Sequence, residues 1–107
     1  MTPAERGKLL SDVKCYLNIT WNDEATERRI GGLIDDGMAY INDKGGGPAD
    51  YLTPVYARTL LFDYVRYARD EALDVFENNY LSLILAFQNN EAVKRYDAAQ
   101  SAEQETG

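Results

Sequence analysis

The chain has 107 residues, of which 45% are hydrophobic and 27% are charged, and its formal net charge is −7. This length and composition predict a single globular domain, and the acidic balance disfavours nucleic-acid binding, which normally needs a clustered basic face. The absence of histidine removes the commonest general base and the commonest transition-metal ligand, so we expect no catalytic residue, no metal site and no cofactor.

Membrane insertion and secretion are also disfavoured. No uninterrupted apolar run approaches the roughly 20 residues needed to cross a bilayer, and the N-terminus carries Glu5, Arg6 and Lys8 where a secretory signal would be apolar. We therefore expect a protein without membrane contact that stays in the cytoplasm where it is made. Cys15 is the only cysteine, so no intrachain disulfide can form, and its neighbours, a tyrosine and a leucine, favour a packed thiol.

The first predicted helix has a clear N-terminal signal. Thr2 can cap it, Pro3 suits its first position, and Glu5 is placed to bond back to the cap. Apolar residues then recur at helical spacing. We expect this helix to end by Asn18, with Ser11 as a second cap if it divides into two short helices.

A second helix is predicted to follow Thr20 or Asn22, either of which can cap it. Its inward face carries Ile30, Leu33, Ile34, Met38 and Ile41. Within this helix Gly31, Gly32 and Gly37 each cost roughly 1 kcal/mol of helix stability relative to alanine. The favoured interpretation is that they let another helix approach closely, and the alternative is a hinge.

The strongest interruption in the chain is formed by Gly45, Gly46, Gly47 and Pro48, which we expect to be a flexible loop within residues 43–52. A glycine run can cradle phosphate, but this one lacks the Gly-Lys-Ser/Thr ending and the preceding strand of a P-loop. The linker interpretation is therefore preferred.

A long helical pattern begins at a second cap-and-proline signal, Thr53-Pro54, and continues to Phe87. An unbroken helix of this length would extend on the order of 50 Å, whereas a compact domain of this size has a radius of gyration of about 13 Å. The pattern must therefore break, near residues 69–71 or at residues 78–79, or its far half must pack on a neighbouring subunit.

The polar C-terminal segment loses the apolar period, so we divide the chain into a helical domain at residues 1–90 and a flexible tail at residues 91–107. No strand pattern is present. The predicted fold class is all-α: a small bundle of three to five helices with a flexible glycine-rich loop and a polar tail. The predicted core comprises Val13, Leu17, Ile30, Leu33, Ile34, Ile41, Leu61, Val65, Phe76, Leu83 and Ile84.

Tyrosine and arginine, two residue types that often anchor protein contacts, occur together in the second half of the chain. Tyr56 and Tyr67 interleave with Arg58, Arg66 and Arg69 near the edge of the apolar stripe. An interface and an ordinary solvated surface fit this group equally well.

Two large residues of the tail, Val93 and Tyr96, lie three positions apart on a possible helical turn without a core partner. We expect them to anchor a binding partner that orders the tail. The alternative is a solubilising tail that makes no contacts.

Several short segments, taken together, carry a family resemblance. They are DVKCYLNI at 12–19, DE at 23–24, LI at 33–34, AYI at 39–41, YVRYA at 64–68, and FENNY at 76–80 with Ile84. In this combination residues 10–89 resemble the head-tail connector (head completion, or adaptor) proteins of long-tailed bacteriophages.

The resemblance implies a structural protein of the virion with no catalytic residues. Subunits of this family assemble, usually twelvefold, into a ring beneath the portal protein of a DNA-filled head. The ring extends the DNA channel and docks the next tail-side component, a stopper or head-closure protein. The expected partners are thus further copies of the chain, the portal protein and that stopper, while DNA passes without specific binding. An acidic subunit suits such a channel because it does not grip phosphate.

Two other classes of protein stay open. A small acidic regulatory binder, such as a DNA mimic that blocks a nucleic-acid enzyme, predicts a monomer or dimer with its acids concentrated on one face. A carboxylate-dependent enzyme would need a bound metal, and the lack of histidine weighs against it.

Overall fold

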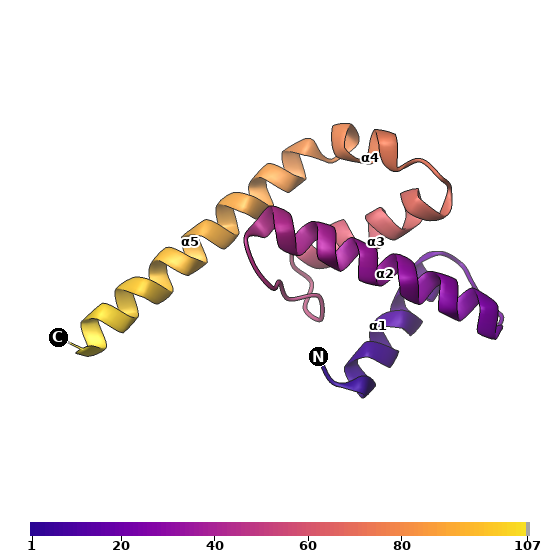
Figure 1. Ribbon diagram of the computed structural model, residues 1–107, viewed down its shortest axis with the longest axis horizontal. Helices are drawn as coiled ribbons and strands as arrows, with labels where there is room; N and C mark the ends of the chain where they lie inside the picture. The colour runs from indigo at the N-terminus through magenta and orange to yellow at the C-terminus, as the bar shows by residue number, and fades with distance from the viewer. Residues whose placement is uncertain (107) are drawn as a thin grey trace.

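The computed structural model describes residues 1–106 and contains five helices, and no strand, within that range. The helices are α1 (Pro3–Tyr16), α2 (Glu24–Gly45), α3 (Tyr56–Arg69), α4 (Leu73–Asn79) and α5 (Leu81–Thr106). Helices α2 and α3 pack together at the centre, α1 contacts both of them, and α4 and α5 pack on them from the other side (Figure 1). The predicted all-α bundle is confirmed.

Helix α1 begins as the sequence predicted. Thr2 Oγ1 accepts the Glu5 N–H at 3.1 Å, and the Glu5 carboxylate accepts the Thr2 N–H at 2.8 Å. This reciprocal capping box satisfies two N–H groups that lack partners within the helix. The helix continues past Ser11 without a break and ends at Tyr16.

The predicted caps of α2 were wrong by one residue or more. Asp23, and neither Thr20 nor Asn22, caps this helix, because its carboxylate accepts the Thr26 N–H at 3.0 Å. An aspartate is one of the strongest capping residues, and its negative charge also complements the helix dipole.

Helix α3 begins at Tyr56, later than the signal at Thr53 and Pro54 predicted. In the preceding turn the Thr53 hydroxyl donates to the Asp50 carboxylate, and Val55, with φ −124° and ψ 175°, is extended and takes the N-cap position. The helix therefore begins only after Val55.

The glycine run is partly helical, which corrects the predicted loop. Gly45 is the last residue of α2 and is buried, and the loop starts at Gly46, whose φ of 82° is the left-handed conformation typical of a helix C-terminus. Gly37 lets another helix approach closely, as predicted, because a Cβ there would lie 2.8 Å from Leu61 and Tyr64. The same prediction was wrong for Gly32, where a Cβ would have no atom within 4 Å.

The long pattern after Pro54 breaks at the first predicted place and one residue after the second, since Asn78 and Asn79 still belong to α4. The first break follows Arg69, where Glu71 adopts a φ of 56° and reverses the chain before α4. The second is at Tyr80, between α4 and α5. Both breaks let the pattern fold back on α2 and α3.

The C-terminal segment is helical as far as residue 106, although the sequence shows no apolar period there, and the predicted flexibility of residues 91–107 stays a prediction. Helix α5 runs without interruption through the boundary expected at residue 90 and ends at Thr106. Most of its distal residues are Ala, Glu, Gln, Lys or Arg, all strong helix formers. Since helix propagation is easier than nucleation, the packed first half of α5 supports the polar second half.

Nine of the eleven predicted core residues are buried, and the other two, Leu33 and Leu83, are partly buried against them. The core also includes Leu9, Ile19, Tyr51, Ala57, Leu60, Tyr64 and Phe87. An aromatic cluster joins α2, α3 and α4, with neighbouring ring centroids 5.0–6.1 Å apart; its members are Tyr40, Tyr64, Tyr67, Phe76 and Tyr80.

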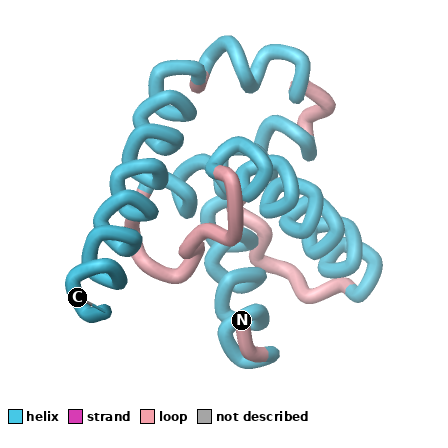
Figure 2. Tube along the Cα trace, turned by 60° about the vertical axis from the view of Figure 1, so that its left-hand side comes forward, coloured by secondary structure: helices cyan, strands magenta, loops and turns pink. Residues whose placement is uncertain are grey.

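The molecule is elongated because α5 extends beyond the other helices. Its principal extents are 55 × 33 × 18 Å and its radius of gyration is 15.8 Å, compared with about 13 Å expected for a compact domain of this length. Figure 2 shows the C-terminal half of α5 standing apart from the remaining helices. Residues 92–101 of this helix are all exposed.

Candidate interaction surface

A shallow groove runs along the outer face of α3. One part, of about 190 Å³, lies beside α1 and includes Tyr16 and Phe62. The other, of about 370 Å³, lies beside α5 and includes Tyr56 and Asn90. The two parts share Pro54 and Thr59, so they form one continuous surface. We call it the α3 groove, lined by Tyr16, Pro54, Val55, Tyr56, Arg58, Thr59, Phe62, Asp63 and Asn90.

Arg58, predicted as an interface residue, is engaged within the chain. Its guanidinium donates to Asp12 Oδ2 at 3.0 Å and to the Tyr51 carbonyl at 3.1 Å, and it lies 4.6 Å from the centroid of the Phe62 ring. The hydrogen bond from Arg58 holds the pKa of the Asp12 carboxyl below its usual range. Arg58 therefore ties α3 to α1 and to the loop before α3.

The other charged residue of the α3 groove is Asp63, which is buried. Its carboxylate accepts a hydrogen bond from the Tyr16 hydroxyl, and this bond raises the pKa of Tyr16. Because Arg58 is ion-paired with Asp12 and Asp63 is only 8% exposed, the surface of the groove consists mainly of aromatic and neutral polar groups.

The remaining predicted interface residues of α3 divide between the interior and the solvent. Tyr67 packs edge-on against Phe76 at 5.7 Å, and Arg69 donates to the Leu17 carbonyl at 3.3 Å. Arg66 is exposed, with its guanidinium 5.4 Å from the Tyr67 ring. Of the five residues on this helix, only Tyr56 and Arg66 are exposed to solvent.

An uncharged stripe follows the exposed side of α5. A helix turns by about 100° per residue, so residues 81, 85, 92, 96 and 99 fall within a sector of about 60°. Leu85 is 55% exposed and Tyr96 is 64% exposed. We call this surface the α5 stripe, composed of Leu81, Leu85, Ala92, Tyr96 and Ala99.

The charged residues in the first two-thirds of α5 lie outside the α5 stripe. They are Glu91, Lys94, Arg95 and Asp97. Val93, predicted with Tyr96 as an anchor, is exposed about 60° around the helix from Tyr96, outside the stripe. The role of both residues in binding stays a prediction. The other residues of the α5 stripe were not predicted, because the sequence pattern indicated a core helix followed by a tail. Their spacing of four, seven, four and three residues along the chain is nevertheless typical of one face of a helix.

The C-terminal end of α2 forms the seat of α5. Gln88 Nε2 donates to the Lys44 carbonyl at 3.1 Å, and Arg95 donates to the Gly45 carbonyl. These carbonyls have no partners within α2, and an arginine at this end also complements the helix dipole. The guanidinium of Arg95 lies directly over Gly46.

The loop that follows is fastened at several points. The Gly47 N–H donates to the Asn42 carbonyl at 2.9 Å, beyond which lies Pro48. Asn42 Oδ1 accepts the Ala49 N–H at 3.0 Å and lies 2.6 Å from the Tyr51 hydroxyl. The predicted mobility of residues 43–52 in the free subunit stays a prediction.

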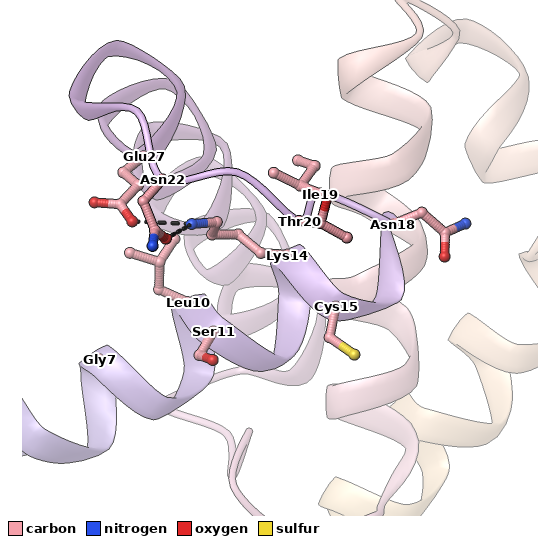
Figure 3. Close-up of a pocket in the computed structure, with 10 residues that line it drawn as sticks. All are labelled: Gly7, Leu10, Ser11, Lys14, Cys15, Asn18, Ile19, Thr20, Asn22 and Glu27. Carbon is pink, nitrogen blue, oxygen red and sulfur yellow. Dashed lines mark hydrogen bonds and ion pairs between the residues drawn. The ribbon is translucent and has the colours of Figure 1, made fainter.

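A separate pocket of about 420 Å³ lies between the end of α1 and the start of α2 (Figure 3). Lys14, whose side chain is 9% exposed, donates to Asn22 Oδ1 at 3.1 Å and Glu27 Oε1 at 2.9 Å. Cys15 is exposed and points away from this pair, so the predicted packed thiol was wrong. Its position on the helix faces solvent, whereas Val13 and Leu17 turn inward. The pocket offers a ligand no uncompensated charge.

Among the described residues, no group of three or more Cys, Asp or Glu side chains is placed to hold a metal ion. No helix in the same part of the chain is long and apolar enough to cross a membrane. No protein-family model, curated protein or solved structure matches the chain. The functional argument therefore depends on the α3 groove, the α5 stripe and the charge of the chain.

Proposed function

We propose that this chain is a structural subunit that assembles into a ring, as a head-tail connector of a long-tailed bacteriophage. The observation that carries the proposal is the exposed, uncharged α5 stripe on a helix that extends beyond the body of a subunit with a net charge of −7. Large apolar side chains exposed along one side of a helix, as at Leu81, Leu85 and Tyr96, are typical of contact with another protein. The resemblance of residues 10–89 to connector proteins is the reason to propose a ring at the head-tail junction.

In this role the ring lies beneath the portal protein at the junction of head and tail, extends the DNA channel and docks a stopper or head-closure protein. Twelve copies are expected because the rings of this family are usually twelvefold. Acidic subunits suit the wall of such a channel, since like charges keep the passing DNA from adhering. The protein would then be a component of the virion without catalytic activity.

The alternative of a DNA mimic depends mainly on the net charge of −7. It requires unpaired acidic side chains on one face. Several acids are instead paired with basic residues, including Asp35 with Arg6 at 2.7 Å and Glu77 with Lys44 at 3.1 Å. These pairs reduce the resemblance to a row of phosphates, so the connector is the preferred proposal.

The test is the native mass of the assembly with and without the portal protein encoded in the same genome. We expect the two proteins to form a complex with many copies of this chain per portal ring, visible as an added ring by electron microscopy. A chain that stays free while intact portal rings are present would overturn the proposal. Inhibition of a nucleic-acid enzyme by the free chain would favour the DNA mimic.

A further inference from the structure

We infer that the α5 stripe of one copy binds the α3 groove of the next copy, so that the chain assembles head to tail. The inference deepens the proposed function by naming the surfaces that join ring neighbours, and it rests on that function only for the closure of the ring. The contact itself can be tested without any other protein.

The α5 stripe has no partner within its own chain. Ile84 and Phe87 face the core from the opposite side of α5, and Arg95 makes the last contact of this helix with α2. Residues 92–101 are all exposed. Because α5 is one continuous helix, it cannot turn the stripe back onto its own α3 groove without breaking.

The charge of the chain favours a second copy as the occupant. Two copies with net charges of −7 repel one another, so a stable contact between them must avoid placing acids against acids. The α5 stripe carries no charged side chain. In the α3 groove, Arg58 is ion-paired with Asp12 at 3.0 Å, and Asp63, which accepts a hydrogen bond from the Tyr16 hydroxyl, is only 8% exposed. A basic partner would instead gain most from the acidic parts of the surface.

The two surfaces also match in form. Ala92, Tyr96 and Ala99 extend over about 10 Å of helix and present one large side chain between two small ones. The groove follows α3 for a similar length past Tyr56 and Thr59. Its part beside α1 is lined by aromatic rings, against which a tyrosine gains contact area with little loss of conformational entropy.

The α5 stripe and the α3 groove are different surfaces, so the contact is heterologous. A heterologous contact leaves one free stripe and one free groove at the ends of any open chain of copies. Such a chain ends only by closing into a ring, which is the arrangement that the proposed function requires. A stripe that paired with itself would instead stop at a dimer.

The test uses two variants with complementary defects. Tyr96→Arg places a charge on the α5 stripe and leaves the groove intact, whereas Thr59→Arg places a charge in the middle of the α3 groove and leaves the stripe intact. Both positions are exposed, and the helical circular-dichroism signal of each variant checks that it folds. Ser101→Arg is the matched control, because it adds the same charge to α5 about 140° around the helix from Tyr96.

We expect wild-type protein and Ser101→Arg to associate with increasing concentration in sedimentation experiments, and each of the other two variants to stay monomeric alone. Mixed in equal amounts, those two variants should form a dimer of twice the 12.1 kDa chain and nothing larger, because only one competent stripe and one competent groove can meet.

Four results would overturn the inference: a wild-type chain that stays monomeric at every concentration, self-association of either defective variant, a mixture that forms no dimer, or loss of association in the Ser101→Arg control. A Tyr96→Arg chain that associates normally but no longer binds the portal would assign the stripe to the portal instead. Rings that form on the portal from Thr59→Arg chains would leave the proposed function standing and remove only this contact.

Discussion

Phe87 packs directly on the backbone of Gly45, because a Cβ at residue 45 would lie only 2.7 Å from Phe87 Cζ. The contact fixes α5 against the C-terminal end of α2. Only glycine allows two helices to approach this closely with a phenylalanine ring between them.

Replacing Gly45 with alanine should therefore lower the free energy of unfolding by about 1–3 kcal/mol, since the added methyl group overpacks the buried Phe87. Gly32→Ala is the matched control in the same helix, where nothing lies within 4 Å. It should raise the free energy of unfolding by about 0.5–1 kcal/mol through helix propensity. Urea unfolding measures both, and changes of the same sign would contradict the assigned contact.

Tyr40 and Tyr51 should respond in opposite ways to loss of the hydroxyl. The buried Tyr40 hydroxyl finds no hydrogen-bond partner among the described residues, whereas the Tyr51 hydroxyl lies 2.6 Å from Asn42 Oδ1. Tyr40→Phe should leave the free energy of unfolding unchanged or raise it by about 1 kcal/mol, because no bond is lost. Tyr51→Phe should lower it by about 1–2 kcal/mol, and thermal unfolding of the two variants distinguishes these outcomes.

Val65 and Leu33, both predicted as core residues, should differ in their tolerance of a charge. Val65 is fully buried, so an aspartate there has no solvent and no partner, and Val65→Asp should unfold the chain. Leu33 is only partly buried, so Leu33→Asp should lower the free energy of unfolding without abolishing the fold. Circular dichroism measures helix content, and a folded Val65→Asp chain would contradict the core assignment.

Tyr80 should make the stability depend on pH in the alkaline range. Burial, with a smaller effect of Asp63, raises the pKa of Tyr80 to about 12, whereas a tyrosine in an unfolded chain titrates at about 10. Between these values the folded state keeps a proton that the unfolded state releases, so the free energy of unfolding falls as pH rises. Urea unfolding at pH about 9 to 12 should show a shallower fall for Tyr80→Phe than for the wild type. Equal falls would exclude Tyr80 as a source.

The sequence predicted those features that depend on near neighbours. The capping box of Thr2 and Glu5 involves residues three positions apart, and the burial of Val13, Ile34 and Val65 follows from helical spacing. The start of α3 was misplaced because Val55 is extended and takes the N-cap position, and the conformation of this turn has no periodic signal in the sequence.

The C-terminal half of α5 was not predicted to be helical. The loss of the apolar period after Val93 predicts the end of the helix, and that prediction was wrong. The apolar period indicates which face of a helix is buried, whereas the propensities of the residues indicate whether a helix forms. Contacts between distant segments were also beyond prediction. Arg58 reaches Asp12, 46 positions earlier, and no feature of either segment indicates the pair.

Part of the candidate interaction surface was predicted from the sequence. Tyr56 and Tyr96 were chosen from residue type and are exposed in the structure. The groove beside Tyr56 depends on how α1 and α5 approach α3, and that arrangement follows from packing over the whole chain rather than from any one segment.

Beyond Phe87, α5 is an unbroken helix that would tilt as a rigid rod about the contact between Phe87 and Gly45. The backbone from Phe87 to Thr106 measures about 28 Å, so a tilt of about 10° at this contact moves the end of the helix by about 5 Å. In a closed assembly the angle between successive copies sets how many copies complete the circle. In the ring proposed above, a methyl group added at residue 45 would alter this angle and with it the diameter of the channel.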